Sequence, residues 1–286
     1  MVYRKKKKNS PRDPKISHLI LKPQRGWVSF DLADLWHYRD LLLLLTWRDI
    51  KIRYTQTILG IAWAMLQPLL TMVVFSVIFG QLAKLPSDGI PYPIFTYTAL
   101  LPWQLFSYSL TNSINSLVGN QNLISKVYFP RLVIPIASVL PSLVDFAFSF
   151  LVLIGLMFYY RVPLTLHMLN LPLFLLLAMI TALACGLWLS ALNVQYRDIR
   201  HVVPFMVLLW QYATPVAYSS SLIPEKWRLL YSLNPMTGVV EGFRWALLGS
   251  GKMGELTWVS ILITIFLLIS GLMYFKRMEL TFADVI

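Results

Sequence analysis

The chain has 286 residues, of which 57% are hydrophobic and only 13% are charged. A soluble domain of this length carries roughly a quarter charged residues, so the composition excludes an ordinary soluble protein and indicates a lipid environment. The net charge of +12 is concentrated: residues 1–58 hold 13 of the 25 Lys and Arg, which is typical of a membrane protein rather than a nucleic-acid-binding one. The single cysteine, Cys185, excludes an intrachain disulfide, and four scattered His offer little for a metal site.

Residues 1–30 are basic and contain three prolines, so we expect a mostly disordered cytoplasmic arm. This arm either only sets the topology or is also attracted to anionic lipid headgroups. Its first basic residues are followed by polar sequence, so no cleavable signal peptide is expected.

Residues 31–57 predict an amphipathic helix lying in the membrane plane. Asp31 is a possible cap for a helix that begins at Leu32. Further along, apolar residues spaced four, three and four apart form one stripe; they are Leu43, Trp47, Ile50 and Tyr54. The segment is too short and too charged to span a bilayer, which favours an interfacial position.

Six apolar segments predict an all-α membrane domain over residues 58–275, followed by a tail at 276–286. The predicted spans are 58–79, 94–114, 132–159, 171–192, 202–218 and 258–275. Pro68 predicts a kink in the first span, and Pro135 and Pro141 predict that the long third span is broken or tilted. Asp145 lies deep in that span; without a partner acid, His or Lys, a hydrogen-bonded structural role is favoured over a proton relay.

The second span is too polar to face lipid on all sides. Hydroxyl and amide residues recur along it, so we expect it to face other helices or a polar conduit. Its aromatic residues either pack and anchor the helix or stack on sugar rings, and composition leaves both open. The candidate conduit residues are Tyr97, Trp103, Gln104, Phe106 and Tyr108.

The connection between the second and third predicted spans is too apolar for a simple loop. It contains Leu123, Ile124, Val127, Tyr128 and Phe129, which need a covering surface. A short helix docked on a cytoplasmic partner would provide one.

The long segment 219–257 holds two helix-like pieces, 224–233 and 237–248, the second ended by Gly249. We expect both to dip back into the membrane from the outer side. The sequence GSGK at 249–252 resembles a phosphate-binding loop, but Ala246 and Met253 break that pattern, so no nucleotide site is expected in this chain.

Charge distribution predicts the orientation. With both ends in the cytoplasm, the inner segments hold 19 Lys and Arg and the outer ones six. Because positive residues are retained on the cytoplasmic side, this N-in, C-in arrangement is strongly preferred over its reverse.

Several motifs together resemble the polysaccharide-export permeases of the type-2 ABC transporter class. They run in order from about residue 41 to 275, are highly specific in combination, and leave residues 1–30 outside the resemblance. The matching segments are 47–54 (WRDIKIRY), 56–60 (QTILG), 101–107 (LPWQLFS), 122–131 (NLISKVYFPR), 193–199 (NVQYRDI), 234–238 (NPMTG) and 241–245 (EGFRW).

The resemblance implies a homodimer that pairs with two copies of a separate cytoplasmic ATPase in the bacterial inner membrane. The cargo it implies is a lipid-linked glycan such as O-antigen, capsule or teichoic acid. ATP and Mg would be bound by the partner subunit, with no cofactor in this chain.

The resemblance also assigns roles to segments. It places an ATPase-coupling helix at Leu123, Ile124, Lys126, Tyr128, Phe129 and Arg131. It places an interface helix at Trp47, Arg48, Asp49, Lys51 and Arg53, and an outer gate at Asn234, Pro235, Glu241 and Arg244. The loop with Arg197 and Asp198 is either a second ATPase contact or a capped turn.

Two other functions remain as alternatives. The same architecture could export a small lipid or a drug, although the long outer segment and the glycan-type motifs count against this. A membrane enzyme of glycan assembly would need a cluster of carboxylates or His, and the sequence shows only isolated acids.

Overall fold

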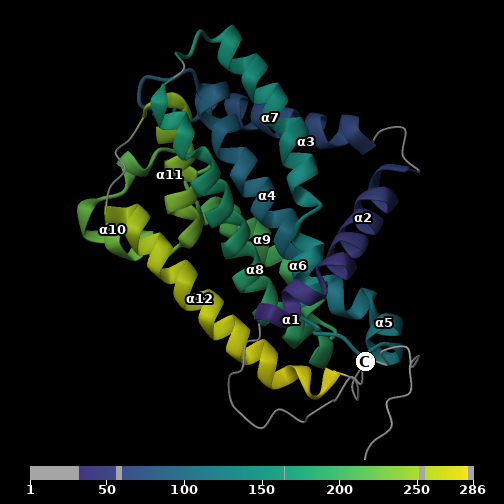
Figure 1. Ribbon diagram of the computed structural model, residues 1–286. Helices are drawn as coiled ribbons and strands as arrows, with labels where there is room; N and C mark the ends of the chain where they lie inside the picture. Colours follow the sequence, from purple (N-terminus) through teal and green to yellow (C-terminus); the bar gives the residue numbers. More distant parts are fainter. Residues whose placement is uncertain (1–31, 56–59, 164, 251–254, 283–286) are drawn as a thin grey trace, which may run out of the picture. The chain divides into compact units, whose positions relative to one another are not determined.

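The computed structural model describes residues 32–55, 60–163, 165–250 and 255–282, and regular structure within these ranges is helical throughout (Figure 1). The all-α prediction is therefore confirmed for this part of the chain. The predicted arm at 1–30, the cap at Asp31 and the last residues of the predicted tail lie outside the described residues.

The elements follow one another in this order: α1 (Leu32–His37), α2 (Arg39–Thr55), α3 (Gly60–Phe75), π-helix η1 (Ser76–Leu82), α4 (Tyr92–Gly119), α5 (Gln121–Lys126), α6 (Val133–Val139), α7 (Ser142–Tyr159), 3-10 helix η2 (Leu166–Asn170), α8 (Leu171–Gln195), α9 (Ile199–Ala213), 3-10 helix η3 (Ser220–Leu222), α10 (Glu225–Ser232), α11 (Pro235–Leu248) and α12 (Glu255–Glu279).

Four helical stretches of the described chain are long and apolar enough to cross a membrane. They are Gly60–Leu82, Val133–Tyr159, Leu166–Gln195 and Thr257–Glu279. The second of these is interrupted at Leu140 and Pro141, between α6 and α7, as the prolines predict. The multi-pass character expected from the composition is thus present in the fold.

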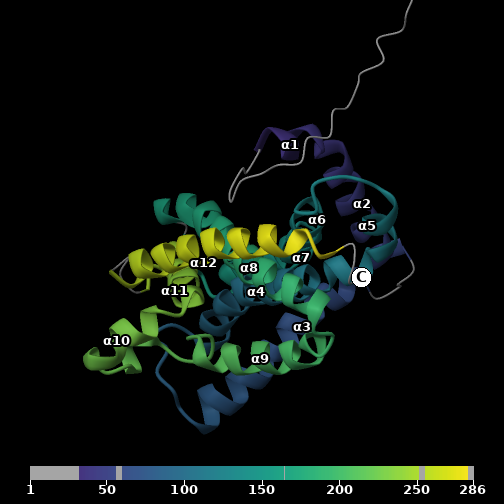
Figure 2. The same cartoon turned by 90° about the horizontal axis from the view of Figure 1, so that it is seen from below.

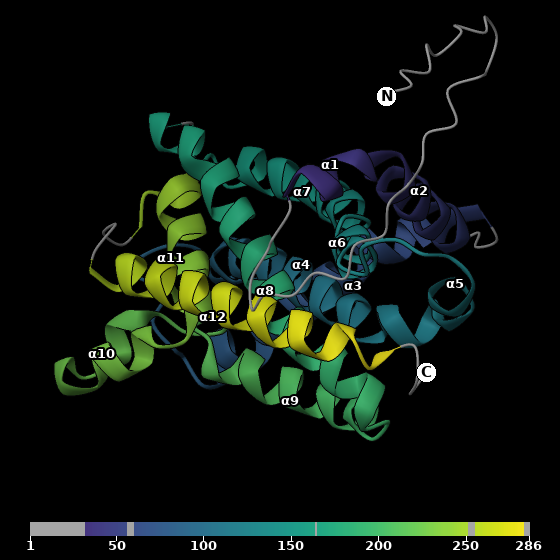
Figure 3. The same ribbon diagram turned by 60° about the horizontal axis from the view of Figure 1, so that its bottom comes forward.

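The polar helix α4 is surrounded by other helices rather than exposed. It packs most extensively against α8, and also against α3, α6, α7 and α11 (Figures 1 and 3). Most of its side chains are buried, including Thr96, Thr98, Ser109 and Ser113. Some of these hydroxyls bond to carbonyls of their own helix, as Thr98 does to Ile94 at 2.8 Å, and the Ser109 hydroxyl reaches the Val139 carbonyl of α6 at 3.5 Å. This confirms that α4 is enclosed by protein.

The fifth predicted span, 202–218, is placed differently by the structure. The helix α9 runs from Ile199 to Ala213, and Thr214 is extended with φ −101° and ψ 146°. Since Pro215 follows and disfavours a helical conformation at Thr214, the helix ends five residues before the predicted boundary.

Small residues allow two of the closest helix contacts. A Cβ at Gly186 of α8 would lie 2.3 Å from the Ser113 hydroxyl of α4, and one at Gly242 of α11 would lie 2.1 Å from the Phe174 ring of α8. Glycine at these positions therefore sets how closely α4, α8 and α11 approach.

The connection between α9 and α12 folds into the two short helices that the sequence predicts. Asn234 accepts a hydrogen bond from the Met236 amide at the start of α11, and Pro235 occupies its first turn. Gly249 ends α11 in the left-handed conformation, with φ +65°. The last helix, α12, packs against α8, α11 and α10 (Figure 2).

Candidate functional site

The predicted coupling segment, residues 122–131, is only partly exposed. Tyr128 is 72% exposed and Val127 is 50% exposed, and Lys126 also faces outward. Ile124 and Phe129 are buried, with Phe129 only 4% exposed, and Leu123 is half-buried. The chain itself therefore covers two of the apolar side chains that the sequence analysis expected a partner to cover.

Arg131 ties the coupling segment to the end of α12. Its backbone amide donates to the Glu279 carboxylate at 3.0 Å, and its guanidinium lies 3.5 Å from the Glu279 carbonyl. The same carboxylate pairs with Lys276 at 2.8 Å. The sequence analysis did not single out Glu279, because nothing local links it to a segment 148 residues earlier.

The predicted interface helix α2 turns its apolar stripe partly outward. Trp47 is 67% exposed and Leu43 is also largely exposed, whereas Leu45 and Thr46 are buried. Lys51 is exposed, and Arg48 pairs with its neighbour Asp49 at 2.7 Å. The helix thus packs through one face and leaves Trp47 and Leu43 exposed.

Asp145 of α7 joins several elements. Its carboxylate pairs with Arg53 of α2 at 2.7 Å and accepts a hydrogen bond from the Tyr54 hydroxyl. The Arg53 guanidinium also lies 5.3 Å from the centre of the Tyr108 ring of α4. The Tyr108 hydroxyl in turn lies 2.5 Å from the side-chain oxygen of Gln67 in α3. Asp145 therefore joins α7 to α2, and contacts of Arg53 and then Tyr108 continue from α2 to α4 and α3.

Tyr54 lies in the same partly buried cluster as Asp145. Burial, together with its hydrogen bond to Asp145, raises the pKa of Tyr54 above its ordinary value. The phenol therefore remains protonated and acts as a donor to the carboxylate. The preference for a hydrogen-bonded role of Asp145 agrees with these contacts, and the partner that the sequence analysis missed is Arg53.

The candidate conduit residues do not share one surface of the chain. Tyr97, Trp103 and Phe106 are buried, whereas Gln104 and Tyr108 are half-buried. The Tyr97 hydroxyl donates to the Ser149 carbonyl at 3.1 Å, and the Phe106 ring packs edge-on against Trp210 at 4.9 Å. In this arrangement the three buried side chains serve packing within the chain.

Arg244 bonds α11 to the residues that follow α9. It is only 1% exposed, and its guanidinium donates to the carbonyls of Val216 and Tyr218 at 2.9 and 3.3 Å. It also pairs with Glu241 at 3.4 Å. Of the candidate gate residues, Arg244 and Glu241 thus lie together within α11, while Asn234 and Pro235 lie at its start.

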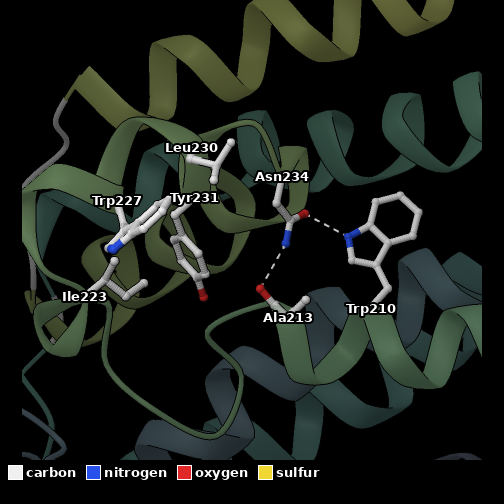
Figure 4. Close-up of a pocket in the computed structure, with 7 residues that line it drawn as sticks. All are labelled: Trp210, Ala213, Ile223, Trp227, Leu230, Tyr231 and Asn234. Atoms are coloured by element: carbon white, nitrogen blue, oxygen red, sulfur yellow. Dashed lines mark hydrogen bonds between the residues drawn. The ribbon is translucent and has the colours of Figure 1, made fainter.

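A pocket of about 300 Å³ lies between the end of α9 and α10 (Figure 4). Its lining is mostly apolar and aromatic: Trp210, Ala213, Ile223, Trp227, Leu230, Tyr231 and Asn234. The Asn234 amide fixes one side, because its oxygen accepts from the Trp210 indole at 2.8 Å and its nitrogen lies 3.4 Å from the Ala213 carbonyl. The pocket therefore depends on the same Asn234 that caps α11.

Among the residues that the structure describes, no three His, Cys, Asp or Glu side chains come together in a way that could hold a metal ion.

A helical membrane fold with a polar central helix and a partly apolar coupling segment is the class of structure expected for a transporter subunit. The chain belongs to the ABC-2 type transporter family, whose model matches residues 40–248.

Two of its relatives share one name. It is 32% identical over 256 residues to the O-antigen export system permease protein RfbA of Klebsiella pneumoniae, a match covering 88% of this chain and 97% of that protein. The protein of this name from Myxococcus xanthus is 34% identical over 217 residues, covering 74% and 82%. The polysialic acid transport protein KpsM of Escherichia coli is 23% identical over 198 residues, covering 68% and 76%.

Proposed function

We propose that this chain is the membrane subunit of an ATP-driven exporter that moves a lipid-linked polysaccharide to the outer side of the bacterial inner membrane. The observation that carries this proposal is the similarity to the RfbA of K. pneumoniae over 97% of that protein's length. Because relatives that are 32% and 34% identical to this chain are named for O-antigen export, O-antigen is the cargo we favour.

Six spans with both ends in the cytoplasm are part of the proposal. Four of the six spans would be the long apolar stretches, and α4 and α9 would be the other two. With 28 residues, α4 is about 42 Å long, which exceeds a hydrocarbon core of about 30 Å. With 15 residues, α9 is about 22 Å long, so the turn residues after Ala213 would complete its crossing. Buried polar groups in α4 are compatible with a span because other helices enclose them.

A separate ATPase would supply the energy. Three adjacent exposed residues of the predicted coupling segment are the surface that we assign to ATPase docking: Lys126, Val127 and Tyr128. Two copies of this chain would pair with two ATPase subunits. The outward apolar side chains of α3 and α9 supply surface for lipid and for the second copy.

The interface helix of the proposal is α2, which bears Trp47, Arg48, Asp49, Lys51 and Arg53. Its exposed Trp47 suits the headgroup region of a bilayer, where tryptophan is enriched. Lys51 on the same helix would face phosphate headgroups.

The conduit and gate complete the proposed mechanism. ATP binding would close the ATPase dimer and push on residues 122–131, tilting the adjacent spans between two states. Tyr97, Trp103 and Phe106 would line the conduit only after such a movement, because they are buried within the chain here. At the outer end, Asn234, Pro235, Glu241 and Arg244 would hold α11 in its closed position.

The test combines genetics with biochemistry. Deleting the gene should remove the surface polysaccharide and leave its lipid-linked precursor in the cytoplasmic leaflet, and the tagged chain should purify with an ATPase. Normal surface polysaccharide in the deletion strain would overturn the proposal and favour export of a small lipid or drug. Transfer of sugar by the purified chain without an ATPase would instead identify an enzyme of glycan assembly.

A further inference from the structure

The break between α6 and α7 leaves a backbone carbonyl without its usual donor. In an α-helix the carbonyl of Ala137 would accept from the amide of residue 141, but Pro141 has no N–H. The Thr46 hydroxyl of α2 lies 3.3 Å from that carbonyl and 2.9 Å from the Leu42 carbonyl of its own helix, so it is shared between them. A side chain from α2 thus takes the place of the missing donor.

The same helix is also bonded to the chain on the far side of the break. Asp145 lies in the first turn of α7, where it pairs with Arg53 and accepts from Tyr54. Thr46 and Arg53 are seven residues apart, which is about two helical turns, so both lie on one face of α2. That face bridges from the last turns of α6 to the first turn of α7.

A second proline in the spans is served in the same way. Pro68 leaves the Ala64 carbonyl of α3 without its amide donor, and the Ser149 hydroxyl of α7 donates to that carbonyl at 2.9 Å. Ser149 lies four residues after Asp145, so one face of α7 carries both contacts. Within a membrane such replacement bonds are valuable because no water is present to satisfy a free carbonyl.

The position of the break makes these contacts mechanically relevant. The coupling segment leads through the turn at Pro130 directly into α6, where the Val133 amide bonds to the Pro130 carbonyl at 3.1 Å. The coupling segment therefore has a direct covalent path into α6. Proline breaks are points where a helix bends, so an unsupported break would absorb the displacement instead of passing it to α7.

We propose that α2 acts as a splint, by which we mean a helix that is bonded to the chain on both sides of the α6–α7 break and keeps the break from bending. Thr46, Arg53 and Asp145 are then positioning residues. They carry displacement of the coupling segment into α7 and, through Ser149, into α3. This role rests on the proposed function, since it presupposes an ATPase that moves the coupling segment. Both contacts are required, because a helix bonded only to α6 or only to α7 cannot prevent bending between them.

The experiment uses the full chain in complex with its ATPase, reconstituted in lipid vesicles with the lipid-linked glycan. Thr46→Val keeps the shape of the side chain and removes the hydroxyl, whereas Thr46→Ser retains the hydroxyl. Asp145→Asn weakens the contact with Arg53 on the α7 side of the break. We expect Thr46→Val and Asp145→Asn each to lower glycan exported per ATP hydrolysed by about fivefold, with ATP hydrolysis unchanged and Thr46→Ser close to wild type. Asp40→Asn, at the exposed start of the same helix, is the matched control and should export as wild type.

The double variant distinguishes a splint from two separate contacts. Because loss of either end releases the hinge, Thr46→Val combined with Asp145→Asn should be no worse than the single variants. Hydrogen exchange in residues 137–147 of the assembled complex should rise to the same extent in all three. If Asp145→Asn fails to assemble, the comparison of Thr46→Val with Thr46→Ser decides.

Two failures can be told apart. Wild-type complex that hydrolyses ATP but exports no glycan would overturn the proposed function. Wild-type complex that exports glycan, while Thr46→Val exports the same amount per ATP and exchanges no faster in 137–147, would overturn the splint alone. Effects that multiply in the double variant would also overturn it.

Discussion

The guanidinium of Arg244 in α11 lies 3.6 Å from the centre of the Phe95 ring in α4, and both side chains are buried. Three carbonyls and Glu241 surround the same guanidinium, so a full charge is held between α4, α11 and the turn that follows α9. A cation enclosed in this way is retained because its donors are satisfied and its charge is paired.

The first prediction concerns this cation. Arg244→Met should destabilise the chain by about 3 kcal/mol, because it leaves Glu241 and several carbonyls without their donor. Arg228→Met is the control: Arg228 forms the same i,i+3 pair with Glu225, but on an exposed surface, so its loss should cost about 0.5 kcal/mol or less. Thermal unfolding in detergent measures both. Equal shifts in Tm would contradict the assignment of Arg244 as a buried clamp.

The second prediction separates two neighbours in the coupling segment. Phe129→Ala should lower the stability of the isolated chain by about 3 kcal/mol, since it empties a buried site. Tyr128→Ala should leave that stability nearly unchanged and weaken co-purification of the ATPase, because the Tyr128 ring is exposed. Thermal unfolding and pull-down of the ATPase give the two readouts. Intact ATPase binding by Tyr128→Ala would exclude Tyr128 from the docking surface.

The third prediction addresses the tether between the coupling segment and α12. Glu279→Gln removes the charge that pairs with Lys276 and weakens the acceptor for the Arg131 amide, at a cost of about 1 kcal/mol. The coupling segment should then be cleaved faster by protease in the isolated chain. Glu225→Gln, at an exposed pair on α10, should not change the cleavage rate. An unchanged rate in Glu279→Gln would show that the tether does not restrain the segment.

The fourth prediction uses two glycines in helices. Gly242→Ala should destabilise the chain by about 2 kcal/mol or more, because the added methyl meets the Phe174 ring at 2.1 Å. Gly155→Ala meets no atom within 4 Å and should be neutral or stabilising by about 0.5 kcal/mol, through reduced freedom of the unfolded chain. Tm measurements on the two variants give the comparison. A stabilising Gly242→Ala would contradict the close packing of α11 on α8.

The fifth prediction concerns the pocket between α9 and α10. Trp210→Phe removes the indole donor to Asn234 and should cost about 1 kcal/mol. Trp227→Phe changes an exposed wall of the same pocket and should have a smaller effect on Tm. If both variants unfold at the same temperature, the Trp210–Asn234 bond does not stabilise the start of α11.

Local sequence signals were sufficient for much of the fold. The prolines at 135 and 141 predict the break in the third span, and glycine at 249 predicts the end of α11, because these residues act through their own backbone. The start of α11 was predicted at residue 237, whereas the helix begins at Pro235. The polar composition of α4 likewise predicts that protein encloses it, since unsatisfied hydroxyls are costly in lipid. The fifth span was predicted to continue to residue 218 because the sequence stays hydrophobic past Thr214. The helical backbone of α9 nevertheless ends at Ala213.

The candidate sites were less accessible from the sequence. A coupling role was predicted for residues 122–131, but the sequence could not distinguish the buried Phe129 from the exposed Tyr128, because both are aromatic and adjacent. Arg53 and Asp145 were each noted separately, yet 92 positions separate them in the chain. No periodicity relates residues at such separations, so only packing could bring them together.

The sequence by itself determined that this chain is helical and lies in a membrane, and its motifs predicted the family, because hydrophobicity and turn chemistry are properties of short segments. Only the tertiary structure decided which carboxylate meets which guanidinium, which aromatic residues are buried, and which hydroxyl serves each orphaned carbonyl. Those outcomes depend on helix packing, where a rotation of one residue, about 100°, moves a side chain to another face.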